Sequence, residues 1–150
     1  MTFALRVMRL AHAEGLALPA YATEGAAGVD LVAAVPESSP VTLDPGERKA
    51  IPTGLVVAIP EGYEGQVRAR SGRALREGLA VLNAPGTIDW DYRGELKVLV
   101  VNLGRDPITL CRGERVAQLV VTPVVRPVVV EVESLEETPR GGGGFGSTGR

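Results

Sequence analysis

The sequence has 150 residues, of which 45% are hydrophobic, and this supplies one domain with a buried core and no room for a second. Its formal net charge of −2 excludes a general attraction to nucleic acid or to an anionic membrane, so any anion must be bound by local arginines. The single cysteine, Cys111, permits no internal disulfide, and the single histidine, His12, lacks the partners of a zinc site or a nucleophilic triad.

The first residues of the chain give no sign of export. Residues 1–6 lack the layout of a signal peptide, and no apolar run in the sequence approaches the length of a membrane span. We therefore expect a cytoplasmic protein whose partner is a small molecule, with no nucleic-acid or membrane partner. His12 is interpreted as a surface loop residue.

Short apolar segments separated by turn residues run along most of the chain. Its 19 glycines and 11 prolines exclude long helices, and only Gly72–Glu77 has the pattern of a helical turn. This spacing predicts an all-β sandwich or barrel. The expected strands are Phe3–Leu10, Leu16–Pro19, Gly28–Val35, Val41–Leu43, Arg48–Ile51, Gly54–Ile59, Gly65–Arg70, Leu79–Leu82, Glu95–Asn102, Pro107–Leu110, Arg115–Val121 and Val124–Val132.

The segment between residues 83 and 95 is predicted to form a hairpin that holds a ligand. The apolar run Leu79–Leu82 leads into it and Leu96–Val101 leads out, with Pro85-Gly86 and Arg93-Gly94 as turn signals. Its two carboxylates, Asp89 and Asp91, are equally typical of residues that stabilise a turn, and Tyr92 of a half-buried strand residue. The hairpin alone does not decide between these interpretations.

The chain changes character after Val132. We divide it into a β domain, residues 1–132, and a glycine-rich tail, residues 133–150, with six glycines among the last eleven residues. Such a tail cannot bury enough surface to order itself, and a loose terminus is the simplest interpretation. However, the tail carries a cation, a ring and two hydroxyls, and when extended it spans on the order of 50 Å, enough to reach a neighbouring subunit.

Five short segments together carry a resemblance that no one of them carries alone. They are Gly28–Leu31, Arg70–Gly72, Ile88–Gly94, Gly113–Leu119 and Arg140–Gly149. In this order and spacing they resemble the five motifs of the trimeric deoxyuridine triphosphate nucleotidohydrolases (dUTPases). The resemblance implies a jelly-roll fold, a homotrimer, and Mg²⁺-dependent hydrolysis of dUTP to dUMP and pyrophosphate. That reaction keeps uracil out of DNA and supplies a precursor of dTMP.

The same resemblance assigns roles to the hairpin. Asp89 is the general base that takes a proton from the water attacking the α-phosphorus, and Tyr92 lies under the deoxyribose and excludes a 2′-hydroxyl. Uracil is recognised by hairpin backbone that imitates a pairing partner, at Asn83, Gly86, Thr87, Ile88 and Lys97. A wrong base leaves such backbone groups unpaired, so this recognition discriminates sharply.

The remaining motifs are assigned by resemblance to the phosphates and the metal. Asp30 holds Mg²⁺ through its water shell, and Phe145 stacks on the uracil as the tail closes as a lid over the site. The phosphates are bound by Arg70, Ser71, Gly72, Gln118, Arg140, Ser147 and Thr148. Without the resemblance, residues 70–72 are an ordinary polar turn, Asp30 is a turn cap, and Gln118 is a structural amide in an apolar run.

Three residues depart from the family pattern. Arg73 replaces a residue that is usually apolar, Ala69 replaces a common proline, and the bulky Trp90 replaces a small or polar residue. The first two bear on subunit packing. Trp90 either covers the site or faces solvent.

Two other functions fit the same scaffold. A dCTP deaminase shares the fold, but the Asp89-to-Tyr92 spacing and the glycine-rich tail favour hydrolysis. A nucleotide-sensing module without catalysis has no need of Asp89 or of the tail, and both are present.

Overall fold

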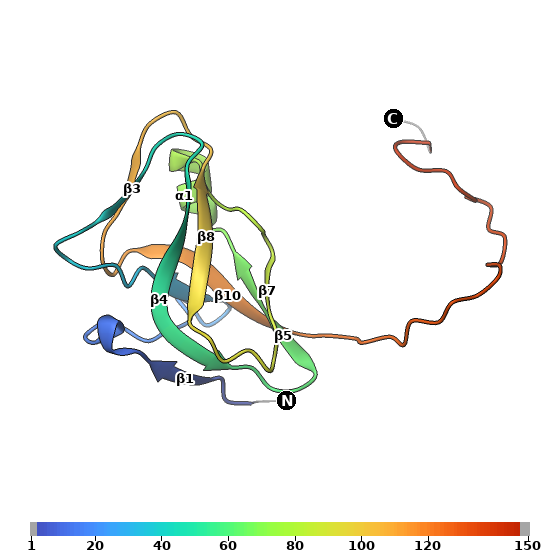
Figure 1. Cartoon of the computed structure of the whole chain (residues 1–150), viewed down its shortest axis with the longest axis horizontal. Helices are drawn as coiled ribbons and strands as arrows, with labels where there is room; N and C mark the ends of the chain where they lie inside the picture. The colour runs from blue at the N-terminus through green and yellow to red at the C-terminus, as the bar shows by residue number, and fades with distance from the viewer. Residues whose placement is uncertain (1–2, 148–150) are drawn as a thin grey trace.

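The computed structural model describes residues 3–147, which fold as an antiparallel β sandwich (Figure 1). One sheet has the strand order β1-β4-β8-β6, and the facing sheet has the order β2-β10-β5-β7. The strands β3 and β9 form a separate two-stranded ribbon. The strands are β1 Arg6–Arg9, β2 Val29–Val32, β3 Val41–Leu43, β4 Arg48–Ala58, β5 Tyr63–Arg68, β6 Leu79–Val81, β7 Gly86–Ile88, β8 Leu96–Asn102, β9 Ile108–Leu110 and β10 Arg115–Pro123. The predicted all-β fold is confirmed.

The core lies between the two large sheets and follows from residue alternation along the strands. In β8, the side chains of Leu96, Val98 and Val100 are completely buried, whereas Lys97 and Leu99 point outward. The facing sheet contributes Val67 from β5 and other buried residues of the same kind. Burying each such side chain contributes roughly 1.5–3 kcal/mol, so the sandwich holds the strands that border the site.

Within residues 3–147, helical structure is confined to two short elements. The helix α1 Ser71–Glu77 ends at Gly78, whose φ of 75° is the left-handed conformation of a helix C-cap. The 3-10 turn η1 Ala11–Ala13 contains His12, so the predicted loop residue lies on a turn and is exposed. No helix within residues 3–147 has the length and apolar character that crossing a membrane requires.

Two predicted strands are one. Arg48–Ile51 and Gly54–Ile59 were predicted as separate strands, but β4 runs without a break from Arg48 to Ala58 through Pro52, a residue that is uncommon inside strands. The proline is accommodated because the ladder between β4 and β8 shifts register between Pro52 and Leu55, which marks a β-bulge.

The predicted hairpin is present, and its central segment changes sheet. β6 and β8 pair antiparallel, from Leu79 with Asn102 to Val81 with Val100. Between them β7, predicted only as part of the turn, pairs with β5 in the facing sheet. The two sheets are therefore separated between β7 and β8, and this separation opens the pocket described below.

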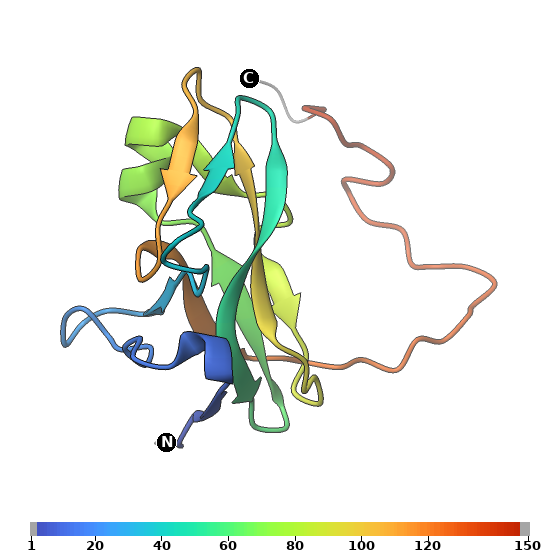
Figure 2. The ribbon, with the colours of Figure 1, turned by 60° about the vertical axis from the view of Figure 1, so that its left-hand side comes forward.

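The prediction of a strand over Val124–Val132 is wrong. These residues, here called the arm, form no strand, and the valines at 125, 128, 129, 130 and 132 are 56–93% exposed. Both views show the arm and the tail leaving the body after β10 (Figures 1 and 2). The arm has the composition of a strand, but a strand also needs a paired edge, and within residues 3–147 the arm pairs with no strand.

Candidate active site

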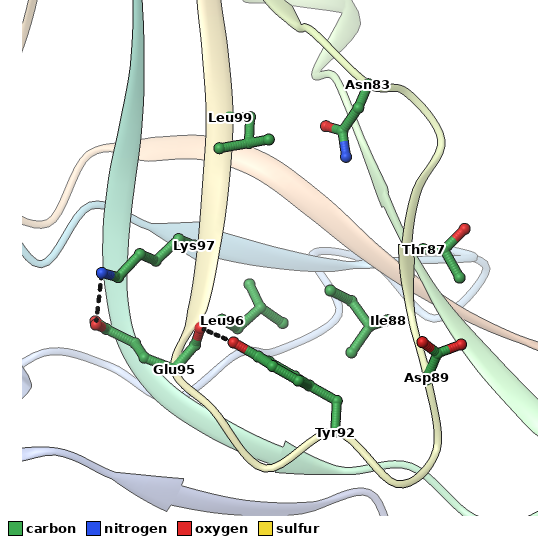
Figure 3. Close-up of a pocket in the computed structure, with 9 residues that line it drawn as sticks. All are labelled: Asn83, Thr87, Ile88, Asp89, Tyr92, Glu95, Leu96, Lys97 and Leu99. Carbon is green, nitrogen blue, oxygen red and sulfur yellow. Dashed lines mark hydrogen bonds and ion pairs between the residues drawn. The ribbon is translucent and has the colours of Figure 1, made fainter.

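A cavity of about 420 Å³ lies between β7 and β8, and we call it the hairpin pocket (Figure 3). Its lining residues are Asn83, Thr87, Ile88, Asp89, Tyr92, Glu95, Leu96, Lys97 and Leu99. The structure thus brings together six of the predicted site residues, and Gly86 is buried beside the Asn83 side chain. Sequence positions 83–99 converge because the hairpin folds β8 back past β7.

Two strand edges border the hairpin pocket. β7 ends the order of its sheet, and the β6 ladder covers β8 only from Val100 to Asn102. Within residues 3–147, no strand pairs with the outer edge of β7 or with the pocket side of Leu96–Lys97. Backbone N–H and C=O groups on such edges are free to bind a ligand.

Asp89 lies at the end of β7 with an exposed side chain at the mouth of the pocket. Its neighbours explain the placement. Ile88 and Trp90 pack half-buried against the core, so the alternation of the chain turns Asp89 outward between them. Trp90 therefore anchors this segment, and neither of its predicted positions, covering the site or facing solvent, describes it.

Tyr92 borders the pocket from the loop that follows β7 (Figure 3). Its hydroxyl donates a hydrogen bond of 3.0 Å to the backbone carbonyl of Glu95. Gly94 leaves room for this ring, because a Cβ at position 94 would overlap the Tyr92 hydroxyl and ring unless the tyrosine moved. The turn signal Arg93-Gly94 thus makes space for the tyrosine.

Sequence reasoning missed Glu95. Its carboxylate is 16% exposed and accepts hydrogen bonds from the backbone N–H of Gly54 at 2.9 Å and from His12 Nε2 at 2.7 Å. These partners lie 41 and 83 residues away in the sequence, so no local pattern indicates the contact.

A second group of predicted residues surrounds the Asp30 carboxylate on β2. Arg70 Nε lies 3.0 Å from Oδ1, Arg115 lies 3.1 Å from Oδ2, and the Gln118 amide donates to Oδ1 at 3.3 Å. We call Asp30, Arg70, Arg115 and Gln118 the arginine cluster. Arg115 lies within the motif Gly113–Leu119 but was not predicted as a site residue. Each guanidinium has further N–H donors, so the cluster can bind an anion.

The arginine cluster and the hairpin pocket do not line one cavity. β2 and β7 are the opposite edges of a four-stranded sheet, which places them about 14 Å apart at three strand spacings. Ser71 and Gly72 open α1 immediately after Arg70 of the cluster, and their N–H groups have no acceptor within the helix. The predicted phosphate donors of the β domain are thus gathered around Asp30 and at the start of α1, and none of them lines the hairpin pocket.

The predicted tail residues stand apart from both groups. Phe145 is fully exposed, and Arg140 Nε donates to the nearby carbonyl of Gly143 at 2.8 Å. Ser147 is exposed and caps a local turn, its N–H bonded to the Gly144 carbonyl at 3.0 Å. Thr148 lies outside the described residues.

Asp30 does not fit a direct metal ligand. Two guanidinium groups hold its carboxylate, and within residues 3–147 no three His, Cys, Asp or Glu side chains gather as a metal site. A carboxylate accepts about four hydrogen bonds, of which the cluster uses three. What fits is an outer role, in which Asp30 accepts from a water of an ion that phosphate oxygens carry, as Mg²⁺ prefers.

Arg73, which departs from the family pattern, forms ion pairs within its own chain. Its side chain is 12% exposed and binds Glu77 at 2.6 Å and Glu114 at 3.4 Å. These two carboxylates compensate the charge at this position, so an apolar side chain is not needed there.

Comparison with known proteins gives one consistent result. The dUTPase family model matches residues 15–149. A deoxyuridine 5'-triphosphate nucleotidohydrolase of Methylocella silvestris is 59% identical over 143 residues, covering 95% of this chain and 89% of the relative. One of Rhizobium leguminosarum bv. trifolii is 57% identical over 145 residues, covering 97% and 93%.

Solved structures agree with the sequence relatives. The dUTPase of Staphylococcus bacteriophage 80alpha with dUpNHpp has a TM-score of 0.87 and 29% identity, covering 99% of this chain and all of that one. A mutant dUTPase from phage phi11 of S. aureus, described with a structural Mg(II) ion, has a TM-score of 0.79 and 27% identity, covering 90% and 100%.

Proposed function

The chain belongs to the dUTPase family, and on that premise we propose how its residues hydrolyse dUTP to dUMP and pyrophosphate. The observation that carries the proposal is the hairpin pocket, in which two free strand edges and the Asp89 carboxylate border one cavity. This arrangement suits an enzyme that recognises a flat base with backbone groups and activates water beside it.

Asp89 acts as the general base. It removes a proton from the water that attacks the α-phosphorus, and the pyrophosphate leaves with the electrons of the broken P–O bond. Because its side chain is exposed at the pocket mouth, it can meet both the water and the phosphate chain. A positioned base contributes roughly 10²- to 10⁴-fold to the rate.

Uracil lies in the hairpin pocket against the backbone of β7 and β8, with Asn83, Gly86, Thr87, Ile88 and Lys97 as the recognition segment. The β5 and β4 ladders fix these edges from behind, so donors and acceptors are held in place before the base arrives. Cytosine leaves them mispaired, which costs binding energy.

Below the base, Tyr92 contacts the deoxyribose. Its hydroxyl is tied to the Glu95 carbonyl, so the ring cannot retreat to admit a 2′-hydroxyl. Ribonucleotides are excluded for that reason.

The arginine cluster binds the triphosphate. Arg70 and Gln118 place N–H donors beside the Asp30 carboxylate. Ser71 adds a hydroxyl, and the backbone N–H groups of Ser71 and Gly72 are free at the start of α1. When Mg²⁺ is bound with the phosphates it neutralises part of their charge, and Asp30 accepts from its water shell. We assign Mg²⁺ as the physiological cation on this basis.

A complete site requires more than one chain, and we propose a homotrimer. The hairpin pocket borders β7 at one edge of the sheet, whereas the cluster gathers around Asp30 on β2 at the other edge, and no cluster residue lines the pocket. In an assembly, the cluster of a neighbouring copy would complete the pocket. The exposed valines of the arm, Val125 and Val128–Val130 among them, form an apolar surface that a neighbouring copy would cover. The tail beyond residue 132 then closes as a lid, with Phe145 on the uracil, and Arg140, Ser147 and Thr148 on the phosphates. The enzyme works in the cytoplasm.

One assay separates the possible activities. The purified protein is expected to release pyrophosphate from dUTP and no ammonia from dCTP. Ammonia from dCTP would indicate a deaminase, and neither product would indicate a binding module.

Complementation tests the shared site. Asp89→Asn and Arg70→Gln are each expected to lose most activity, and copies mixed after dissociation should regain part of it, because some sites then combine an intact Asp89 with an intact Arg70. Light scattering gives the mass of the assembly. A monomer, or mixed copies that stay inactive, would contradict the proposal.

A further inference from the structure

The bulge of β4 lies opposite the end of the hairpin. Pro52 pairs with Lys97 and Leu55 with Leu96, so Thr53 and Gly54 are extra residues in the ladder. Gly54 has a φ of +65°, and a Cβ there would overlap Ala13 of η1, so this position is suited to glycine alone. A bulge withdraws backbone groups from the ladder, and these groups need other partners.

The end of the hairpin bonds both to the backbone and to a side chain of the bulge. The Glu95 carboxylate accepts from the Gly54 N–H at 2.9 Å, and the Thr53 hydroxyl donates to the Leu96 carbonyl at 2.6 Å. His12 Nε2 approaches the same Glu95 oxygen at 2.7 Å from the other side. Glu95 thus joins three elements, namely the bulge of β4, the start of β8 and η1.

The same residue also holds Tyr92. While its carboxylate faces the bulge, its backbone carbonyl accepts the Tyr92 hydroxyl bond of 3.0 Å (Figure 3). Lys97 Nζ lies 3.8 Å from the second carboxylate oxygen and lines the pocket as well. A shift of the Glu95 backbone would therefore move the acceptor that fixes the tyrosine ring.

We propose that Glu95 is a positioning residue that sets the depth of Tyr92 in the hairpin pocket and so sharpens the selection of deoxyribose. The carboxylate, held by the bulge and by His12, prevents the loop from shifting when a ribonucleotide presses on the ring. This inference rests on the proposed function, which places Tyr92 against the sugar. Small misplacements of a positioning group carry large kinetic costs, so the effect is measurable.

The decisive comparison is between two changes at one position. Glu95→Gln keeps an oxygen that accepts from Gly54, whereas Glu95→Ala leaves that N–H unpaired. Glu95→Ala should raise KM for dUTP about tenfold, lower kcat less, and reduce the preference for dUTP over UTP by a similar factor. Glu95→Gln should stay within about threefold of the parent on all three quantities.

A matched control comes from the other side of the fold. Glu47 also binds a backbone N–H, that of Asp44 at 2.9 Å, and a cation, Lys49 at 3.1 Å, but it lies outside both groups of site residues. Glu47→Ala should leave KM and the dUTP preference unchanged. If Glu95 served stability alone, Glu95→Ala would behave like Glu47→Ala, with less active protein but the same KM and preference, and that result would overturn the inference.

Coupling to Tyr92 gives a second readout. Tyr92→Phe removes the hydroxyl bond, so adding Glu95→Ala to it should reduce the deoxyribose preference little further, whereas independent roles would give multiplied losses. A parent protein that does not hydrolyse dUTP would overturn the proposed function instead. A parent that selects dUTP while Glu95→Ala selects it equally well would overturn only the role of Glu95.

Discussion

The hairpin pocket and the tail are assigned to the same reaction, yet they differ in how the chain holds them. The pocket is bordered by β7 and β8, each held by a ladder to a strand of the same chain. The tail has no strand or helix over residues 133–147, and Phe145 at its end is fully exposed. We infer from this difference that the strands bordering the pocket are in place before a ligand binds, whereas the tail would need a ligand or a neighbouring copy to pack against.

The largest effect is expected from a change of Asp89, at the mouth of the pocket. Asp89→Asn should lower kcat by roughly 10²- to 10⁴-fold, because the amide cannot take a proton, while dUTP binding is largely retained. Steady-state kinetics and calorimetric binding check both. Since the side chain is exposed, Tm should hardly move, and unchanged turnover would remove Asp89 from its role.

Removing the tail tests whether it acts as a lid. A chain ending at Glu133 should lose roughly 10- to 100-fold in kcat/KM, because a lid excludes water and completes the site. Its thermal unfolding should match that of the full chain, since the tail contributes nothing to the core. A tail deletion that lowers Tm strongly would show that the tail packs on the body, and full activity would show that no lid is needed.

A smaller effect is expected from Gly94→Ala. The added methyl would overlap the Tyr92 hydroxyl and force the ring to shift, so KM for dUTP should rise about tenfold. Kinetics on dUTP and UTP measure the change. Equal KM values for Gly94→Ala and the parent would mean that the ring position does not matter for binding.

The smallest effect is expected far from both regions, at Glu47. The backbone N–H of Asp44, and next Lys49, hold the pKa of the Glu47 carboxyl below its usual 4.5. A carboxyl with a lowered folded-state pKa stabilises the fold above its unfolded pKa and loses this as pH falls through the folded value. Glu47→Gln should therefore lower Tm at pH 7 by at most about 2 °C, with the difference vanishing well below pH 4.5 and activity unchanged. Melting curves from pH 7 to pH 3 measure it.

Sequence patterns predicted the parts of the fold that local rules determine. The apolar run from Leu96 predicted β8, and the turn signals before it predicted the β6–β8 hairpin. The continuity of β4 through Pro52 was missed because a bulge depends on the facing strand. The strand predicted over Val124–Val132 was wrong because composition gives β propensity without giving a partner edge.

In the candidate site, too, residues that a local motif indicates were predicted, and residues whose partners are distant in sequence were not. The site residues between 83 and 97 were predicted from the resemblance of one short segment, and six of them line one pocket in the structure. Glu95 could not be found this way, because its partners Gly54 and His12 are distant in sequence. Arg115 was missed because only the register of β10 against β2 brings it to Asp30.

The central claim is that the hairpin pocket binds the uracil nucleotide with Asp89 facing the reacting phosphorus. A crystal structure with dUpNHpp tests this most directly. The account predicts the pyrimidine between Gly86–Ile88 and Lys97, with one water bridging the Asp89 carboxylate and the α-phosphorus. A pyrimidine bound elsewhere, or an Asp89 carboxylate turned away from the phosphates, would contradict it.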